Sequence, residues 1–90
     1  MTNINCIMNM TKSFIGGEID SMSYALDFPF EVETRYQMMV SENHAYADLI
    51  FECLVEGGAY KFNELSDTQF KKLIQKQFDH VRSVACDGFC

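Results

Sequence analysis

Two glycine pairs, Gly16-Gly17 and Gly57-Gly58, divide a chain whose apolar residues otherwise recur at helical spacing. Such pairs end helices, because the residue just beyond a helix often takes a left-handed backbone conformation that glycine tolerates best. The chain has 90 residues and a single proline, and this length is near the lower end of the range in which a chain folds alone. We therefore expect one all-α domain spanning residues 1–90.

The residues before the first glycine pair predict one helix. Either Met8 or Met10 could serve as the start of translation, so residues 1–9 are expected to be less well ordered. The apolar residues of this helix recur at helical spacing and are Ile4, Ile7, Met8, Phe14 and Ile15.

A second helix is expected to begin at Asp20 or Ser21, since both residue types favour the N-cap position. Pro29 falls inside this helix and has no backbone N–H to donate. It therefore predicts a kink, or a break near Asp27 followed by a new helical turn. The expected apolar stripe has Met22, Leu26 and Phe30 on one face, with Tyr24 and Phe28 on a flank, and continues through Val32, Tyr36 and Met39.

A third helix is expected from His44 to Glu56, after a cap within Ser41–Asn43 and before the second glycine pair. For the segment that follows the glycine pair, Ala59-Tyr60-Lys61-Phe62, the sequence allows a short extended structure as an alternative to a helical one. The apolar face of the third helix is expected to consist of Tyr46, Leu49, Ile50, Cys53 and Leu54.

The last helix has the clearest start, because Ser66 and Gln69 have the spacing of a capping box. Helices joined by short connections predict an antiparallel four-helix bundle, here with the second helix kinked or broken at Pro29. The apolar stripe of the last helix consists of Phe70, Leu73, Ile74, Phe78, Val81 and Val84.

No residue pattern in this chain predicts catalysis. His44 and His80 lie far apart in the sequence, and neither has a nucleophile or a second ligand at helical spacing, so both are expected to be structural or solvated. The glycine pairs lack the lysine of a phosphate-binding loop, and no EF-hand pattern is present. We expect neither an enzyme, nor a metal site, nor a cofactor.

The four cysteines are scattered and include no C-x-x-C pair. No basic stretch followed by an apolar segment opens the chain, which predicts no secretory signal, a cytoplasmic location and reduced thiols. Cys86 and Cys90 frame a C-x-x-x-C tail without a histidine at ligand spacing, so no metal or redox role is expected there. Residues 86–90 are expected to be poorly ordered.

Acidic residues are concentrated between Glu18 and Asp67, where eleven acidic side chains accompany two basic ones, Arg35 and Lys61. This stretch therefore carries a net charge of −9, although the whole chain carries only −6. Such an excess destabilises a small domain through self-repulsion, and it argues against binding to nucleic acid or to an anionic membrane. It predicts a surface for a strongly basic partner, or, in the simpler interpretation, a face that keeps the protein soluble.

One acidic row is regular. Asp48, Glu52 and Glu56 follow each other at four-residue spacing on the expected third helix, which places them on one face with no lysine or arginine on that helix. Asp27 and Glu31 form a further acidic pair on the second helix. The expected recognition surface consists of Asp48, Glu52, Glu56, Tyr60, Glu64 and Asp67.

Three stretches resemble the colicin D immunity-like proteins. Phe14–Tyr24 is similar to the opening motif of that family, Asp48–Tyr60 to its third helix and tyrosine-bearing loop, and Leu65–Phe70 to its capped last helix. The resemblance covers residues 10–82. It implies a helical-bundle immunity protein that inhibits the nuclease domain of a bacteriocin or of a contact-dependent growth inhibition toxin.

The resemblance also implies a mechanism, in which carboxylates occupy the basic cleft that would otherwise hold tRNA phosphates. On this chain the carboxylates would come from Asp48, Glu52, Glu56, Glu64 and Asp67, with Tyr60 and Tyr46 as aromatic anchors. The implied partner is the basic C-terminal domain of the toxin, bound by one immunity monomer in a 1:1 complex. The alternative is a non-enzymatic adaptor domain that binds a basic segment of another protein.

Overall fold

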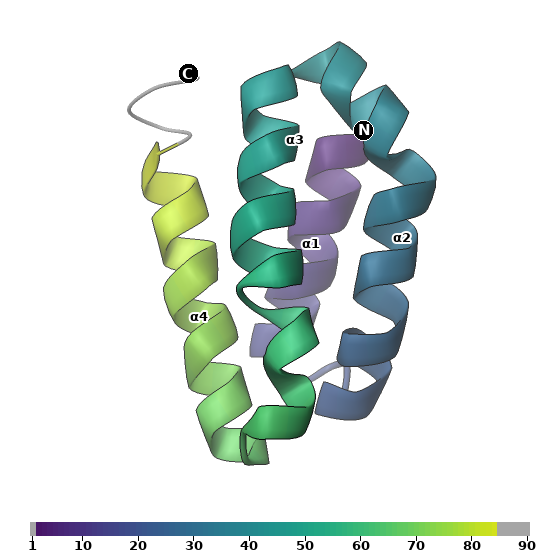
Figure 1. Cartoon of the computed structure of the whole chain (residues 1–90). Coiled ribbons are helices and arrows are strands. Elements are labelled where there is room, and N and C mark those ends of the chain that lie inside the picture. Colours follow the sequence, from purple (N-terminus) through teal and green to yellow (C-terminus); the bar gives the residue numbers. More distant parts are fainter. Residues whose placement is uncertain (1, 85–90) are drawn as a thin grey trace.

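The computed structural model describes residues 2–84, which form a bundle of helices and confirm the all-α class (Figure 1). Figure 1 shows the chain reversing direction from one long helix to the next. Along the chain the elements are α1 (Asn3–Ile15), α2 (Ser21–Glu42), α3 (His44–Ile50), the π-helix η1 (Phe51–Glu56), the 3-10 helix η2 (Ala59–Glu64) and α4 (Asp67–Val84).

The first turn of α1 is closed by two side chains. Thr2 Oγ1 accepts the backbone N–H of Asn5 at 3.1 Å, and the carboxylate of Glu42 accepts those of Asn3 and Ile4 at 2.8 and 2.9 Å. These N–H groups have no partner within their own helix, so a carboxylate from the end of α2 satisfies them. Residues 3–9 are therefore part of a capped helix.

The second helix begins at Ser21, with Asp20, one of the two predicted cap residues, as its N-cap, and it continues to Glu42 without the break that Pro29 was predicted to allow. Asp20 accepts the backbone N–H of Ser23 at 3.2 Å as the N-cap, and the Ser23 side chain together with this N–H holds the pKa of the Asp20 carboxyl below its usual range. Pro29 is buried inside the helix and leaves the carbonyl of Ala25 without its usual donor. The helix continues because core packing on both sides of Pro29, through the fully buried Phe28 and Val32, fixes its path.

The structure corrects the predicted apolar face of α2. Met22, Leu26 and Phe30, the predicted face, are 59%, 69% and 65% exposed, whereas Tyr24 and Phe28, the predicted flank, are buried together with Val32 and Met39, which the predicted stripe included. Met22, Leu26 and Phe30 follow each other at four-residue spacing, as do Tyr24, Phe28 and Val32, so α2 carries two apolar stripes and can turn only one of them toward the core. The buried stripe continues to Met39, whereas the exposed one gives way to polar residues after Phe30.

Aromatic rings from α1, α2 and α4 pack together in the core. Phe14 stacks on Tyr24 with ring centroids 4.5 Å apart, and Phe70 packs against Phe14 at 5.6 Å. The Tyr24 hydroxyl shares a buried hydrogen bond of 2.8 Å with Thr11, so the polar tip of this ring is satisfied. The expected core residues Phe70, Ile74, Phe78 and Val81 of α4 are buried.

The predicted third helix is helical over its whole expected range but changes its winding. After Ile50 it becomes the π-helix η1, and the backbone N–H of Gly57 reaches the carbonyl of Glu52 at 3.0 Å. At Gly58, an added Cβ would lie 2.6 Å from the Leu54 carbonyl oxygen, so only glycine fits there. The segment after Gly58, for which the sequence allowed an extended structure, forms the 3-10 helix η2.

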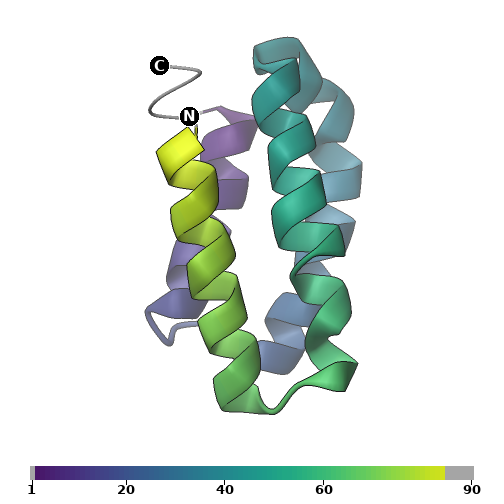
Figure 2. The same ribbon diagram turned by 60° about the vertical axis from the view of Figure 1, so that its left-hand side comes forward.

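Helices α2 and α4 lie on opposite sides of the bundle, with α3 beside both, in the view of Figure 1 and again after rotation in Figure 2. None of the helices within residues 2–84 combines the length and the hydropathy that crossing a bilayer requires. The tail with Cys86 and Cys90, for which the sequence predicted poor order, lies outside the described residues.

Candidate functional site

Asp48, the first carboxylate of the predicted acidic row, is engaged in contacts within the protein. The Tyr36 hydroxyl donates a hydrogen bond to one oxygen, and Nε2 of His44 lies 3.1 Å from the other. The hydrogen bond to this carboxylate, together with burial, raises the pKa of Tyr36. Asp48 thus joins α3 to α2, and its side chain remains 44% exposed.

The other two carboxylates of the row are exposed on η1. The side chains of Glu52 and Glu56 are both exposed to solvent. Within residues 2–84, neither carboxylate forms a hydrogen bond or an ion pair with another side chain. These two side chains are therefore available to cationic groups of a partner.

The remaining predicted residues lie around η2 and the start of α4. The Tyr60 ring is 55% exposed, and Glu64 lies 3.7 Å from the Lys61 ammonium in an exposed pair. Exposed pairs of this kind contribute about 0–1 kcal/mol, so Glu64 can exchange its partner easily. Asp67 accepts a hydrogen bond from the Ser21 hydroxyl, which joins the start of α4 to the start of α2.

Two contacts set the register between α2 and the segment that runs antiparallel to it in Figure 1. Tyr36 reaches Asp48 at one end, and Ala25 and Ala59 line the same groove at the other. Phe30 of α2 therefore lies at the level of η1. We use the name α2–η1 face for the exposed residues of this region, which are Met22, Leu26, Phe30, Glu52, Glu56 and Tyr60.

The groove at one end of this face has a volume of about 420 Å³. Tyr60 and Leu26 stand on either side of it as exposed side chains, and no charged residue lines it. Sequence reasoning found Tyr60 but missed the apolar half of the face. The signal was present, because a helix with two apolar stripes must expose one of them. The groove is lined by Met22, Ala25, Leu26, Ala59, Tyr60, Phe62 and Asn63.

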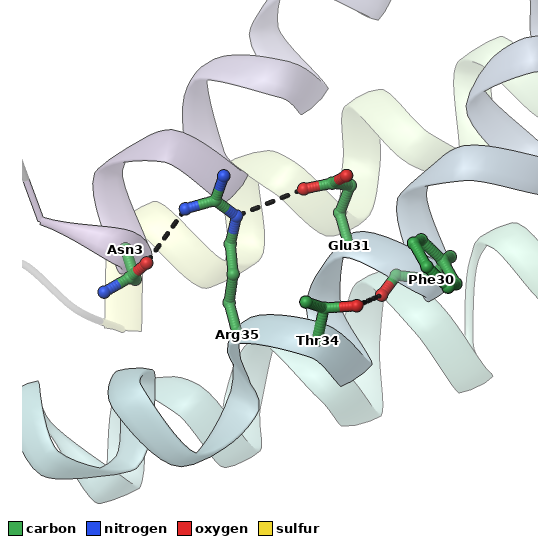
Figure 3. A network of polar contacts seen from close by, with 5 residues as sticks. All are labelled: Asn3, Phe30, Glu31, Thr34 and Arg35. Atoms are coloured by element: carbon green, nitrogen blue, oxygen red, sulfur yellow. Dashed lines mark hydrogen bonds and ion pairs between the residues drawn. The ribbon is translucent and has the colours of Figure 1, made fainter.

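Other acidic residues of α2 serve to attach α1. Arg35 donates to the Glu31 carboxylate at 3.1 Å and to the Asn3 side-chain oxygen at 2.9 Å (Figure 3). Backbone hydrogen bonds from Ile4 and Asn3 hold the pKa of Glu42 below its usual range. Glu31 and Glu42 thus have structural roles, which distinguishes them from Glu52 and Glu56.

Charge is separated across the bundle. The exposed lysines Lys71, Lys72 and Lys76 lie on α4, and within residues 2–84 none of them pairs with a carboxylate. Lys72 and Lys76 line a groove together with Gly57 and Lys61, whereas the groove beside Tyr60 and Leu26 has no charged lining residue. In the same part of the chain, no group of three or more His, Cys, Asp or Glu side chains could hold a metal ion.

Comparison of the chain with protein-family models, with curated proteins and with solved structures found no match. The resemblance to the colicin D immunity-like proteins over residues 10–82 therefore stays a prediction. The function of the chain is therefore inferred from the exposure, charge and contacts of the α2–η1 face.

Proposed function

We propose that this chain is an immunity protein that binds and inhibits a cognate nuclease toxin, a tRNA-cleaving RNase, in the cytoplasm. The observation that carries the proposal is the pair of exposed, unpaired carboxylates of Glu52 and Glu56 within a stretch of net charge −9. A nuclease cleft is basic because it must hold a polyanion. Fixed carboxylates on a rigid helix compete with phosphates for the same arginines and lysines.

The acidic face has a kinetic as well as an energetic role in this proposal. Complementary charge steers association, with rate constants up to about 10⁸–10⁹ M⁻¹s⁻¹ at low salt. Steering alone does not hold a complex together, since tight interfaces also need apolar or aromatic anchors that exclude water. Tyr60, exposed beside the carboxylates of η1, is the aromatic residue of the predicted surface that supplies such an anchor.

The inhibitor acts by occupancy and performs no chemistry in this proposal. One monomer covers the cleft of one toxin domain, so substrate tRNA is excluded and no cofactor or metal is needed. Asp48, Glu64 and Asp67 take secondary roles, because each already has a partner within the protein. Glu64 exchanges Lys61 for a toxin cation most easily, since that pair is exposed.

The test uses the nuclease domain encoded by a reading frame beside the gene, which the proposal requires to exist. The wild-type chain is expected to protect cells that express this domain and to block tRNA cleavage by the purified domain. The double variant Glu52→Lys/Glu56→Lys is expected to inhibit about a hundredfold less or worse, since close charge pairs at an interface contribute several kcal/mol. Its circular dichroism should remain helical.

The matched control is Glu18→Lys/Asp79→Lys, which makes the same change in net charge at two exposed carboxylates outside the α2–η1 face. It should inhibit like the wild type. If both double variants lose inhibition equally, the effect comes from overall charge and not from these two positions. If neither variant loses inhibition, Glu52 and Glu56 are not part of the binding surface.

The second candidate is a non-enzymatic adaptor that binds a basic segment of another protein. The uncharged groove beside Tyr60 favours it, because a groove of about 420 Å³ can accept side chains of an extended or helical peptide. A neighbouring reading frame that ends in a nuclease domain supports the immunity protein, and its absence supports the adaptor.

A further inference from the structure

Met22, Leu26 and Phe30 form an unusual surface for a small water-soluble bundle. They follow each other at four-residue spacing along α2, and each is at least 59% exposed. The stripe adjoins the groove in which Met22 and Leu26 meet Tyr60. Large apolar side chains that gather in this way mark interaction sites, whereas single exposed ones do not.

The charges around this stripe are of one sign. Between Glu18 and Thr34 the chain carries five acidic residues and no basic one. Arg35, which directly follows this stretch, pairs with Glu31, and Lys61 of the neighbouring η2 forms an exposed pair with Glu64. A partner that covers the stripe must therefore place lysines or arginines around its own apolar side chains.

A second copy of the chain fits this surface poorly. Pairing of two stripes would bring the acidic residues beside them, such as Asp27, close to those of the other copy, and no basic residue lies between Glu18 and Thr34 to offset them. Like charges placed opposite each other at an interface oppose binding. The charge pattern thus favours a cationic partner over self-association.

We propose that Met22, Leu26 and Phe30, with the groove beside Tyr60, dock an apolar segment of a partner protein whose apolar side chains are flanked by lysine or arginine. The identification of that partner with the nuclease toxin rests on the proposed function. Leu26 and Phe30 are the anchors that lose water on binding, and Glu52 and Glu56 pair with the flanking cations. The stripe supplies the affinity that steering by charge alone does not provide.

The docking chemistry is tested with a synthetic amphipathic helical peptide composed of leucine and lysine. Its binding site is mapped by chemical-shift changes in the labelled protein, and its affinity is measured by calorimetry. Shifts are expected at Met22, Leu26, Phe30 and Tyr60. The double variant Leu26→Gln/Phe30→Gln is expected to bind roughly tenfold more weakly or worse, since loss of a buried anchor weakens an interface to that extent.

Two controls separate the stripe from general stickiness. Met38→Gln removes another exposed apolar side chain of α2, 50% exposed and outside the stripe, and should bind the peptide like the wild type. A peptide with glutamate in place of every lysine should not bind. The glutamine variants keep helix-forming residues at exposed positions, so their circular dichroism should match that of the wild type.

Several results would overturn the inference. These are unchanged peptide binding by Leu26→Gln/Phe30→Gln, shift changes centred on α4, or a wild-type dimer in sedimentation that this variant turns into a monomer. With the nuclease domain, full inhibition by this variant would also overturn it and leave the proposed function intact. Conversely, a wild-type chain that binds the peptide at the stripe but inhibits no nuclease contradicts the proposed function alone.

Discussion

Glu42, the last residue of α2, accepts the backbone N–H of Ile4 at 2.9 Å and so closes the first turn of a helix 38 residues away in the sequence. A second oxygen of the same carboxylate accepts the N–H of Asn3 at 2.8 Å. The N-terminal end of a helix also favours negative charge through its dipole. One side chain thereby fixes the N-terminus of α1 against the C-terminus of α2.

We predict that Glu42→Gln lowers the melting temperature by several degrees at neutral pH, because a neutral amide accepts fewer of these hydrogen bonds. Differential scanning calorimetry measures the effect. Glu33→Gln removes a charge from an exposed position of the same helix and should leave the melting temperature nearly unchanged. Equal shifts in the two variants would contradict a capping role for Glu42.

The same carboxylate predicts a pH dependence. Hydrogen bonds from the backbone N–H groups of Ile4 and Asn3 hold its pKa in the folded protein below the ordinary value of a glutamate, so its contribution to stability is fully present above that ordinary pKa. The contribution is lost as the pH falls through the folded pKa, where the carboxylate gains its proton in the native state. The difference in melting temperature between wild type and Glu42→Gln should therefore be largest at neutral pH and shrink below about pH 4. A difference that grows on acidification would contradict this assignment.

The buried hydrogen bond between Tyr24 and Thr11 predicts a measurable loss on mutation. Both side chains are fully buried and their oxygens lie 2.8 Å apart. Tyr24→Phe keeps the ring stacked on Phe14 but leaves Thr11 with only its longer contact to the Ile7 carbonyl at 3.4 Å. We expect a loss of about 1–2 kcal/mol in the free energy of unfolding, measured by urea titration.

The double variant Thr11→Val/Tyr24→Phe completes the cycle. It removes both polar groups, so no hydroxyl is left buried without its partner. It should cost less than the sum of the two single variants. Additive losses would show that the two hydroxyls do not act as a pair.

Local signals in the sequence predicted the positions where backbone chemistry decides the structure. The capping box is reciprocal, since Ser66 N–H donates to Gln69 Oε1 at 3.1 Å and Gln69 N–H donates to Ser66 Oγ at 3.2 Å. Gly17, with φ of 88°, ends α1 at the expected glycine pair. Caps and turns of this kind depend on a few neighbouring residues, so sequence is sufficient to find them.

The choice of buried stripe on α2 depends on partners that lie far away in the sequence. Tyr24 is buried because Phe14 and Phe70 stack around it, and nothing within α2 encodes those contacts. The acidic row has the same limitation, because its spacing does not reveal that Asp48 is bound by Tyr36. The sequence therefore shows which residues are acidic, but not which of their carboxylates are already bound within the protein.

The tight packing at Gly58 predicts a sharp difference between glycines. A Cβ there would lie 2.6 Å from the Leu54 carbonyl oxygen and 2.9 Å from the terminal methyl group of Ile74. Gly58→Ala must therefore displace backbone of η1, and we expect a loss of about 1–3 kcal/mol in the free energy of unfolding. At Gly16 an added Cβ meets nothing closer than 3.4 Å, so Gly16→Ala should be nearly neutral in the same urea titration. Similar losses in both variants would contradict the close approach at Gly58.

The contact between Tyr36 and Asp48 predicts that Asp48 acts mainly within the fold, whereas the other carboxylates of the acidic row act in binding. The hydrogen bond to the carboxylate of Asp48 raises the pKa of Tyr36, so Asp48→Asn should lower that pKa toward the ordinary value of a tyrosine. Alkaline titration followed by NMR at the Tyr36 ring measures the change. Inhibition of the nuclease domain should weaken less with Asp48→Asn than with Glu52→Gln, because Asp48 is already hydrogen-bonded within the protein. A larger effect at Asp48 would mean that this carboxylate leaves Tyr36 and turns toward the toxin on binding.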